Sequence, residues 1–404
     1  METWLTYLAA LLMAGATAFT FSSSSSLFGM MSTLTSYLTG IAAFLFLGTS
    51  IVTMAAGTAS LRKNKLGGKV LRTTILWAVI TTLVLSFLGA FAARFVDVIF
   101  PVSASAGGDY ESEITSFLSV IDPLCSSAFL SKCFIPALIA SFILGVALTP
   151  SSDIIRPAYT VMNSFSEVMY RIQRTLTYFG ACYVYVAATT FFLGLWQEKT
   201  AFAAPEPFIA LIVATLVVVL VILPLLFAFF TGFKKNPYGV IGRGLSGLIT
   251  AFVSGNLFAS SLIGESLSRS NLGIQKRISS TVTPLSIVIT RGGTAFVSTL
   301  TVITLLKTLG AEISMVALIL LTLAIAGASF LSSLFSGIEV AAISVIALKM
   351  LNINIYGAEA AIVSLIPFIN GCALLIDMTL SLMANAISGA RTKTDAKIPL
   401  KDTI

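Results

Sequence analysis

The sequence contains no histidine and has little charge. Only 10% of its 404 residues are Asp, Glu, Lys or Arg, against about 25% in an ordinary soluble domain. The absence of histidine excludes histidine general bases, metal ligands and proton relays. The hydrophobic share of 57% is larger than a soluble core needs. We therefore expect an integral membrane protein, and without a nucleophile–base pair or a metal cluster we expect no enzyme.

Cysteine is also scarce, and its pattern points to no metal site. The four cysteines do not have metal-ligand spacing. Cys125 and Cys133 both fall on the side predicted below to be external, where a disulfide and two free thiols both remain open. The four are Cys125, Cys133, Cys182 and Cys372.

The chain lacks the ten-residue segments of alternating polarity that are typical of transmembrane β-barrels. It has continuous apolar runs instead, and about 20 apolar residues span a bilayer as a helix. Residues 1–20 show no basic segment followed by a cleavage site, so they are predicted to be a first transmembrane helix. The fold class is therefore an all-α polytopic membrane protein. The early apolar runs lie at roughly 4–30, 33–60, 71–100, 132–149, 157–194 and 206–232.

The net charge is +7, and the basic residues are distributed as in a membrane protein. We therefore expect no nucleic-acid partner. The basic residues gather in short loops and the C-terminal tail, which the positive-inside rule predicts to be cytoplasmic. The acidic segment 109–113 lies in an aperiodic stretch, 101–131, that is predicted to be an external loop. The basic residues are Arg62, Lys63, Lys65, Lys69, Arg72, Lys234, Lys235, Arg243, Arg391, Lys393, Lys397 and Lys401.

Two later segments are predicted to be re-entrant hairpins. The apolar stretch that starts at residue 240 is broken by small residues, and a polar stretch follows too soon for two full spans. This predicts a hairpin over about 240–277. A second apolar stretch is interrupted at 332–339, and the arm that follows is too short to span. It predicts a hairpin over about 313–351.

A broken helix and a last helix complete the pattern. Segment 279–308 holds Gly292 and Gly293 in mid-membrane, where a helix break is tolerated only against protein or a water-filled cavity. Segment 357–390 is the last helix and contains Asp377. Broken helices and paired hairpins are typical of transporters that bind substrate at the membrane midplane.

Two charged side chains mark the candidate site. An intramembrane carboxylate such as Asp377 is costly and suggests function, although a structural bond to a neighbouring helix is the alternative. Asp377, Ser381 and Ser388 share one helical face. Arg291 needs an anionic or carbonyl partner, and Asp377 and Glu339 are both candidates. It either binds a substrate carboxylate or occupies a cation position, or it forms a purely structural ion pair.

From about residue 36 to residue 392 the chain resembles the dicarboxylate/amino acid:cation symporters, the glutamate-transporter family. Ile121–Leu148 resembles the family's proline-containing loop and following helix, and Asn163–Thr189 resembles its fifth helix. Ser280–Ala295, STVTPLSIVITRGGTA, lines up with the family pattern TLPxGATxNMDGTA. The two hairpins and the last helix follow in the family's order.

The resemblance implies an elevator fold of eight transmembrane helices and two re-entrant hairpins, assembled as a homotrimer. The scaffold is expected in 1–70 (helices 1 and 2) and 101–195 (the external loop with helices 4 and 5). The transport domain is expected in 71–100 (helix 3) and 206–404 (helix 6, both hairpins, helices 7 and 8, and a cytoplasmic tail). The second hairpin is expected to be the external gate.

The departures from the family motifs bear on the coupling ion. Two sodium-site residues of the family, an Asn and an Asp, are Thr290 and Gly292 here. The final sodium-binding Asp is Ser388. The arginine that holds an acidic substrate side chain is Leu380, while the Asp that binds the substrate amino group is kept as Asp377. Thr81 and Thr82 match the Thr-Ser pair of the third helix, whereas Ala384 stands for an Asn that Asn385 could replace.

The expected site follows from these matches. The substrate contacts are Asp377, Ser381, Arg291, Thr294, Asn385, Ser260, Gly337 and Ile338. The hairpin tips that gate the site include Ala259, Ser336 and Glu339. The degenerate cation site comprises Thr81, Thr82, Thr290, Gly292, Ser332 and Ser388. We expect no cofactor, although a sodium ion at one mostly backbone site near Ser332 stays open.

The predicted function is a secondary transporter or exchanger of amino acids or related small carboxylates. In this prediction Arg291 supplies the positive charge that relatives take from sodium. Sodium-coupled symport remains open, as does proton coupling through Glu339 or Asp377, because burial disfavours a charged carboxylate. An anion-conducting channel and a non-transporting sensor are further alternatives. The expected location is a multi-pass position in a prokaryotic cytoplasmic membrane, with the lipid bilayer and a small-molecule substrate as partners.

Overall fold

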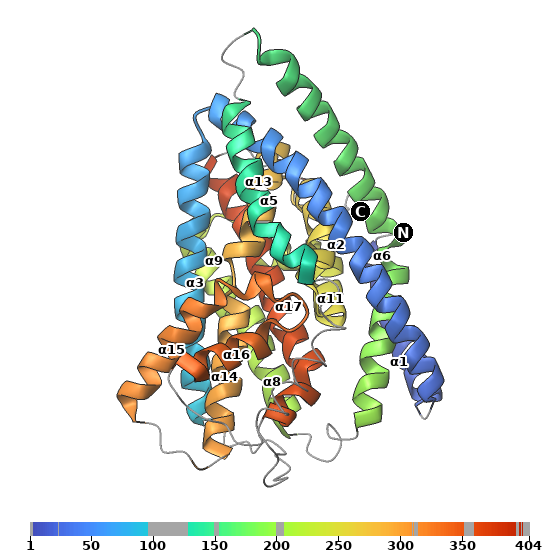
Figure 1. Ribbon diagram of the computed structural model, residues 1–404. Coiled ribbons are helices and arrows are strands. Elements are labelled where there is room, and N and C mark those ends of the chain that lie inside the picture. The colour runs from blue at the N-terminus through green and yellow to red at the C-terminus, as the bar shows by residue number, and fades with distance from the viewer. Residues whose placement is uncertain are drawn as a thin grey trace.

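A computed structural model describes most of the chain, and its regular elements are helices (Figure 1). Among the described residues there is no β-sheet, so the all-helical prediction is confirmed for them. Most of the predicted external loop, including Cys125, and most of the C-terminal tail lie outside the described residues. The structure describes residues 3–22, 24–95, 128–148, 153–198, 206–308, 310, 314–350, 359–392, 396 and 398.

Seven helical segments in the described part are long and apolar enough to cross a membrane. The run after α6 is one apolar segment with a π-helical turn, η2, in its middle. The apolar part of α5 (Ala128–Ala147) is shorter, so a total of eight spans stays a prediction. The seven are α1 (Thr3–Thr20), α2 (Ser25–Lys63), α3 (Gly67–Phe95), α6 (Arg156–Glu198), α8–η2–α9 (Glu206–Val217, Val218–Ile222, Leu223–Thr231), α13–α14 (Lys276–Ile289, Gly292–Thr308) and α17 (Glu359–Thr392).

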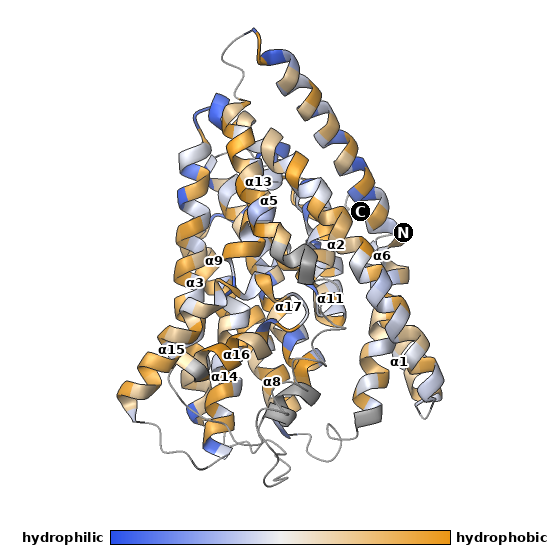
Figure 2. Cartoon of the chain, viewed as in Figure 1, coloured by the Kyte–Doolittle hydropathy of each residue, from blue (hydrophilic) through white to orange (hydrophobic). Residues whose placement is uncertain are grey.

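Two of these segments form the centre of the molecule. The apolar windows of α13–α14 and of α17 are each 89% buried, whereas those of the other five are between 28% and 44% buried. The outer helices carry exposed apolar side chains such as Phe44 and Phe91, and much of the α3 ribbon is orange in Figure 2. A hydrophobic exterior over this length is expected where lipid is the solvent. Most of the described polar residues of α13, α14 and α17 are buried within it.

Two pairs of short helices lie in the ranges predicted for hairpins. α11 (Leu245–Ser254) and α12 (Leu257–Ser270) pack together and follow α10 (Pro237–Arg243). Gly255 makes the turn between them with φ +57°, a conformation that favours glycine. Asn256 then caps α12 by accepting hydrogen bonds from the backbone of Phe258 and Ala259.

The second pair has a longer tip. α15 (Met315–Ser329) packs on α16 (Glu339–Met350), and the short 3₁₀ turn η3 (Ser332–Leu334) lies between them. Gly337 has φ +94° immediately before α16, which again favours glycine.

A polar seam joins α12 to α6. The Gln173 side-chain nitrogen donates to the Glu265 carboxylate at 3.0 Å and to the Thr49 hydroxyl at 3.0 Å. Arg269 forms an ion pair with Glu167 at 3.0 Å. Because α6 belongs to the predicted scaffold and α12 to the predicted transport domain, this seam lies between the two.

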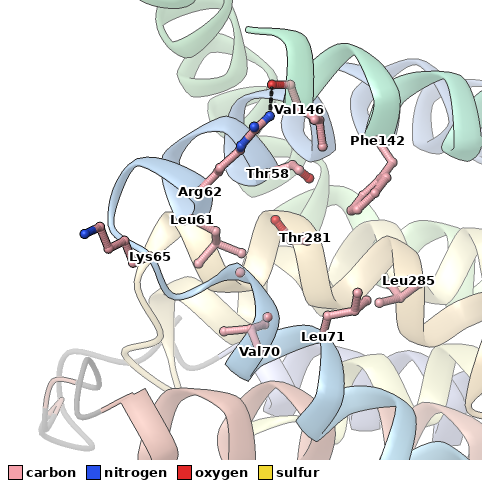
Figure 3. Close-up of a pocket in the computed structure, with 12 residues that line it drawn as sticks. Thr58, Leu61, Arg62, Lys65, Val70, Leu71, Phe142, Val146, Thr281 and Leu285 are labelled. Atoms are coloured by element: carbon pink, nitrogen blue, oxygen red, sulfur yellow. Dashed lines mark hydrogen bonds between the residues drawn. The ribbon is translucent and has the colours of Figure 1, made fainter. Parts of the chain in front are cut away.

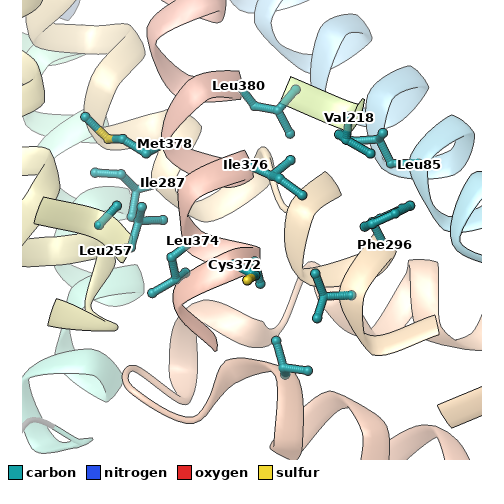
Figure 4. Close-up of a cluster of buried hydrophobic side chains, with 14 of the residues drawn as sticks. Leu85, Val218, Leu257, Ile287, Phe296, Cys372, Leu374, Ile376, Met378 and Leu380 are labelled. Atoms are coloured by element: carbon teal, nitrogen blue, oxygen red, sulfur yellow. The ribbon is translucent and has the colours of Figure 1, made fainter. Parts of the chain in front are cut away.

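Hydrophobic packing fixes α17 among its neighbours (Figure 4). Leu380 and Ile376 of α17 face the side of α3 and α14, where Leu85 and Phe296 lie. The Trp77 indole of α3 also donates a hydrogen bond to the Leu380 carbonyl at 3.1 Å. These contacts hold the polar face of α17 against the break between α13 and α14.

Candidate functional site

The site is built around the break between α13 and α14. Thr290 ends α13 in a non-helical conformation, and α14 starts at Gly292. The Asp377 carboxylate accepts hydrogen bonds from the Gly293 amide at 2.6 Å and the Thr294 hydroxyl at 2.6 Å, and a longer one from the Thr294 amide at 3.3 Å. Asp377 therefore caps α14, where backbone donors and the helix dipole favour an anion.

The glycine pair lets α14 approach α17 closely enough for this cap. A Cβ atom on Gly293 would clash with the Ala373 carbonyl oxygen and with Ile376. A Cβ atom on Gly292 would press against Leu85 and Leu380. Gly292, which the sequence resemblance aligns with a sodium-site Asp of the family, therefore faces an apolar wall.

Arg291 lies inside the site with an incomplete set of partners. Its side chain is 1% exposed, and Nη1 lies 3.8 Å from the Asp377 carboxylate. Its Nε and Nη1 make no hydrogen bond within the described part of the chain. Charged pairs that are hydrogen-bonded are shorter, about 2.7–2.9 Å, so the guanidinium has donors to spare.

Asn370 of α17 holds both hairpin tips. Its side-chain nitrogen donates to the Glu339 carboxylate at 2.7 Å and to the Gly255 carbonyl at 2.9 Å. Glu339 also accepts from the Gly337 amide at 2.9 Å. The two tips touch directly, because the Asn256 side-chain nitrogen donates to the Ser336 hydroxyl at 2.9 Å.

A second polar contact line joins α13 to α17. The hydroxyls of Ser286 and Ser381 lie 2.5 Å apart. The Asn385 side chain donates to the Thr283 hydroxyl at 3.1 Å and to the Ser381 carbonyl at 3.0 Å. The Thr290 hydroxyl donates a hydrogen bond to the Ser286 carbonyl at 2.6 Å. Ser381, Asn385 and Thr290 are thus bonded within the protein.

The positions expected to form a degenerate cation site differ in their contacts. Thr81 donates to the Trp77 carbonyl at 2.7 Å, and the hydroxyls of Ser388 and Thr74 lie 3.4 Å apart. The buried hydroxyls of Thr82 and Ser332 make no hydrogen bond in the region described. Among the described residues, no three of the His, Cys, Asp and Glu side chains gather as metal ligands would.

Two predicted site residues lie inside a helix rather than at a tip. Ala259 and Ser260 belong to the first turn of α12, and the Ser260 hydroxyl bonds the Leu257 carbonyl at 3.0 Å. Gly337 and Ile338 lie at the second tip, where Ile338 is buried.

Sequence reasoning missed three polar residues of this region: Asn370, Thr283 and Ser286. Asn370 comes seven residues before Asp377 and therefore lies on the same face of α17, a spacing that could have revealed it.

The site is enclosed, since Asp377, Arg291 and Glu339 are each at most 1% exposed. Apolar helices long enough to cross a membrane surround a buried ion pair at the break between α13 and α14. This arrangement is that of a polytopic helical membrane protein with a polar site inside its helix bundle. The chain belongs to the sodium:dicarboxylate symporter family, whose model matches residues 3–390. It is therefore a membrane transport protein and not an enzyme, and the family resemblance predicted from the sequence is confirmed. A comparison with curated proteins finds no match.

Proposed function

We propose that this protein is a secondary transporter or exchanger of amino acids or related small carboxylates in which Arg291 replaces a coupled cation. It works by an elevator movement within a homotrimer, as the family resemblance implies. The observation that carries the proposal is the Arg291 guanidinium, which is 1% exposed and 3.8 Å from Asp377.

The charge balance of the site favours a built-in cation. Arg291 brings one permanent positive charge 3.8 Å from the buried Asp377. A second buried acid, Glu339, is bonded to Asn370 of the same helix as Asp377. The two positions at which the family resemblance expects sodium-binding carboxylates are Gly292 and Ser388. An isolated buried charge is very costly, so a site that gains a cation and loses acids needs fewer bound cations.

The contacts of Arg291 suit a substrate carboxylate. A guanidinium presents five donors in a fixed fork that matches a carboxylate. Nε and Nη1 have no hydrogen bond to the described residues, so a carboxylate beside them would satisfy donors that are costly to leave unmet.

The site lacks the arginine that would pair with an acidic substrate side chain. Leu380 occupies the position at which the family resemblance expects a substrate-binding arginine, and it packs in the hydrophobic cluster. A Cβ atom added at Gly292 would contact the Leu380 side chain. Asp377 is the carboxylate available to a substrate ammonium, although it already accepts three hydrogen bonds from Gly293 and Thr294. A neutral amino acid, with its carboxylate on Arg291, fits these contacts best.

The arrangement of the hairpins supports alternating access. Both tips meet at Asn370, directly beside the ionic site on the same helix. The α6–α12 seam combines polar contacts with an apolar cluster that includes Val184 of α6 and Ile263 of α12. The external gate in this proposal is the second hairpin, which contains Ser336 and Glu339.

Sodium-coupled symport is the second candidate, and a specific observation favours it. The hydroxyls of Thr82 and Ser332 are buried and unbonded in the described region, and hard cations prefer such oxygen ligands. A sodium ion bound by either hydroxyl would keep the coupling that the family description names.

The test is ligand-induced thermal stabilisation of the purified protein with a panel of amino acids and dicarboxylates. Each ligand is measured in sodium chloride and again in choline chloride. A ligand that binds only the folded state stabilises it by RT ln(1 + [L]/Kd), about 2.7 kcal/mol at a hundredfold excess over Kd. The proposal expects stabilisation that is indifferent to sodium, whereas a sodium-dependent shift supports the second candidate.

The matched variants are Arg291→Met and Arg277→Met. Arg277 lies at the start of α13, within the same apolar segment but at its partly exposed end. Arg291→Met is expected to abolish binding or to make it sodium-dependent, and Arg277→Met is expected to do neither. An Arg291→Met protein that binds the ligand as before, with no sodium dependence, would show that the built-in cation proposal is wrong.

A further inference from the structure

A cavity lies outside the ionic site, at the turn between α2 and α3 (Figure 3). Its volume is about 290 Å³, close to the lower limit of small-molecule pockets, about 300 Å³. α5 and α13 complete its walls with residues such as Phe142 and Leu285. It therefore has room for part of a small ligand, and none of the proposed substrate contacts line it.

The cavity combines an apolar wall with a basic rim. The wall is formed by Leu61, Leu71 and Leu285, among others. Arg62 and Lys65 line the rim and are exposed. Residues 3–95 contain no Asp or Glu, so no acid of α1, α2 or α3 offsets this charge. A ligand that fits has an anionic head and an apolar tail.

The polar details of the cavity agree with this chemistry. Arg62 donates from Nη1 to the Val146 carbonyl at 2.7 Å, which fixes its guanidinium at the rim (Figure 3). Thr58 also lines the cavity, is 6% exposed, and has a buried hydroxyl without a hydrogen bond in the described part. A ligand ester or glycerol oxygen could accept from it.

The position of the cavity favours a lipid over a soluble anion as its ligand. The basic turn between α2 and α3 is predicted to face the cytoplasm. It therefore lies at the depth of the lipid headgroups, because α2 and α3 are candidate spans that end there. Basic pockets between transmembrane helices on this side recognise anionic headgroups.

We propose that this cavity binds one anionic phospholipid. Its phosphate lies at Arg62 and Lys65, its glycerol ester region at Thr58, and one acyl chain along Leu61, Leu71 and Leu285. The walls come from α2 and α5 and from α3 and α13, so the lipid contacts both predicted domains at once. The proposal is independent of the substrate and of its coupling ion.

The experiment measures lipid binding to the purified full-length protein in neutral detergent by native mass spectrometry and thermal stability. Three probes are compared: dioctanoyl phosphatidylglycerol, dioctanoyl phosphatidylcholine and glycerol 3-phosphate. The proposal expects one tightly bound phosphatidylglycerol, with a rise in melting temperature, and no such effect from the other two. Equal binding of phosphatidylcholine, or an equal effect of glycerol 3-phosphate, overturns it.

Paired variants locate the binding. The double variant Arg62→Ala, Lys65→Ala is expected to weaken phosphatidylglycerol binding by roughly 30-fold, since each basic residue near anionic lipid contributes about 1 kcal/mol. The control is Lys63→Ala, Lys69→Ala, which removes the same charge from exposed residues of the same turn that do not line the cavity. An equal loss in the control shows diffuse surface attraction and overturns the site.

A variant that fills the cavity tests the acyl chain. Gly68 lines the cavity, and a Cβ on it would meet no atom within 4 Å, so Gly68→Phe is expected to fold and to exclude the lipid. Gly48→Phe on α2, where a Cβ also meets nothing, is the control. Phosphatidylglycerol binding that survives Gly68→Phe unchanged would contradict the proposed tail position and with it the site.

Discussion

The side-chain nitrogen of Asn370 lies 2.7 Å from the Glu339 carboxylate and donates a hydrogen bond to it. The same nitrogen reaches the Gly255 carbonyl of the other hairpin at 2.9 Å. A single residue of α17 therefore bonds to the tips of both hairpins. The two tips also contact each other through Asn256 and Ser336, which are 80 residues apart in the sequence. Its neighbour on the same face, Asp377, holds the start of α14.

Asn370→Leu is expected to lower stability and to loosen both tips. The change leaves the Glu339 carboxylate and the Gly255 carbonyl without this donor. An unsatisfied buried polar group costs about 1–3 kcal/mol, and more when it is charged. Thermal unfolding of the purified protein measures the effect. Asn163→Leu, which changes an exposed side chain on α6, is the control, and equal melting temperatures for the two variants would contradict the prediction.

Arg291 and Asp377 are expected to be energetically coupled. Their charges lie 3.8 Å apart in a buried site, so removing either one leaves the other less compensated. The double variant Arg291→Met, Asp377→Asn should therefore lose less stability than the sum of the single variants, with a coupling of about 0.5–3 kcal/mol. The cycle is measured by thermal unfolding at low salt. A parallel cycle of Arg291→Met with Asp153→Asn should be additive, and additivity in both cycles would rule the ion pair out.

Gly293→Ala is expected to damage the site although alanine favours helices. The new Cβ clashes with the Ala373 carbonyl oxygen, a backbone atom that cannot move aside alone. Gly327→Ala is the matched control, because a Cβ there meets no atom within 4 Å. That change should be neutral or stabilising by up to about 1 kcal/mol. Yield and melting temperature are compared for the two proteins, and a Gly293→Ala protein as stable as the control would contradict the close approach.

Gln173 is expected to stabilise the folded protein because its side chain donates a hydrogen bond to the buried Glu265 carboxylate. Gln173→Leu removes the donor that serves the buried Glu265 carboxylate and the Thr49 hydroxyl, and we expect a loss of about 1–3 kcal/mol. Gln173→Leu with Glu265→Leu should be less damaging than Gln173→Leu alone, since the uncompensated charge is gone. Thermal unfolding compares them with Gln275→Leu, whose side chain is exposed. A double variant less stable than Gln173→Leu would argue against this account.

Local patterns account for the parts of the fold that the sequence predicts. Apolar length alone identifies spans such as α3 and α17, because a bilayer requires it. The glycines at 292 and 293 predict the break between α13 and α14, since adjacent glycines have low helix propensity. These signals depend on neighbouring residues and need no knowledge of distant contacts.

The partners inside the site could not be deduced from the sequence in the same way. Arg291 had two candidate acids, and only the three-dimensional arrangement places it 3.8 Å from Asp377. The role of Asp377 as the cap of α14 depends on contacts 83 and 84 residues away. Asn370 is one amide among apolar neighbours, and nothing next to it in the sequence indicates that it reaches two hairpins. Its spacing of seven residues from Asp377 indicates that both side chains lie on one face of α17, but not which distant groups they bond.

The double attachment of Asn370 has a consequence for electrical insulation. Each hairpin tip has its own bond to α17, in addition to the bond between Asn256 and Ser336. In the proposed transport cycle, a tip that moves away would leave the other tip bonded to Asn370. A continuous water path past both tips would then require both bonds to break at the same time. Under that proposal Asn370 would limit ion leakage through the protein without itself touching the substrate.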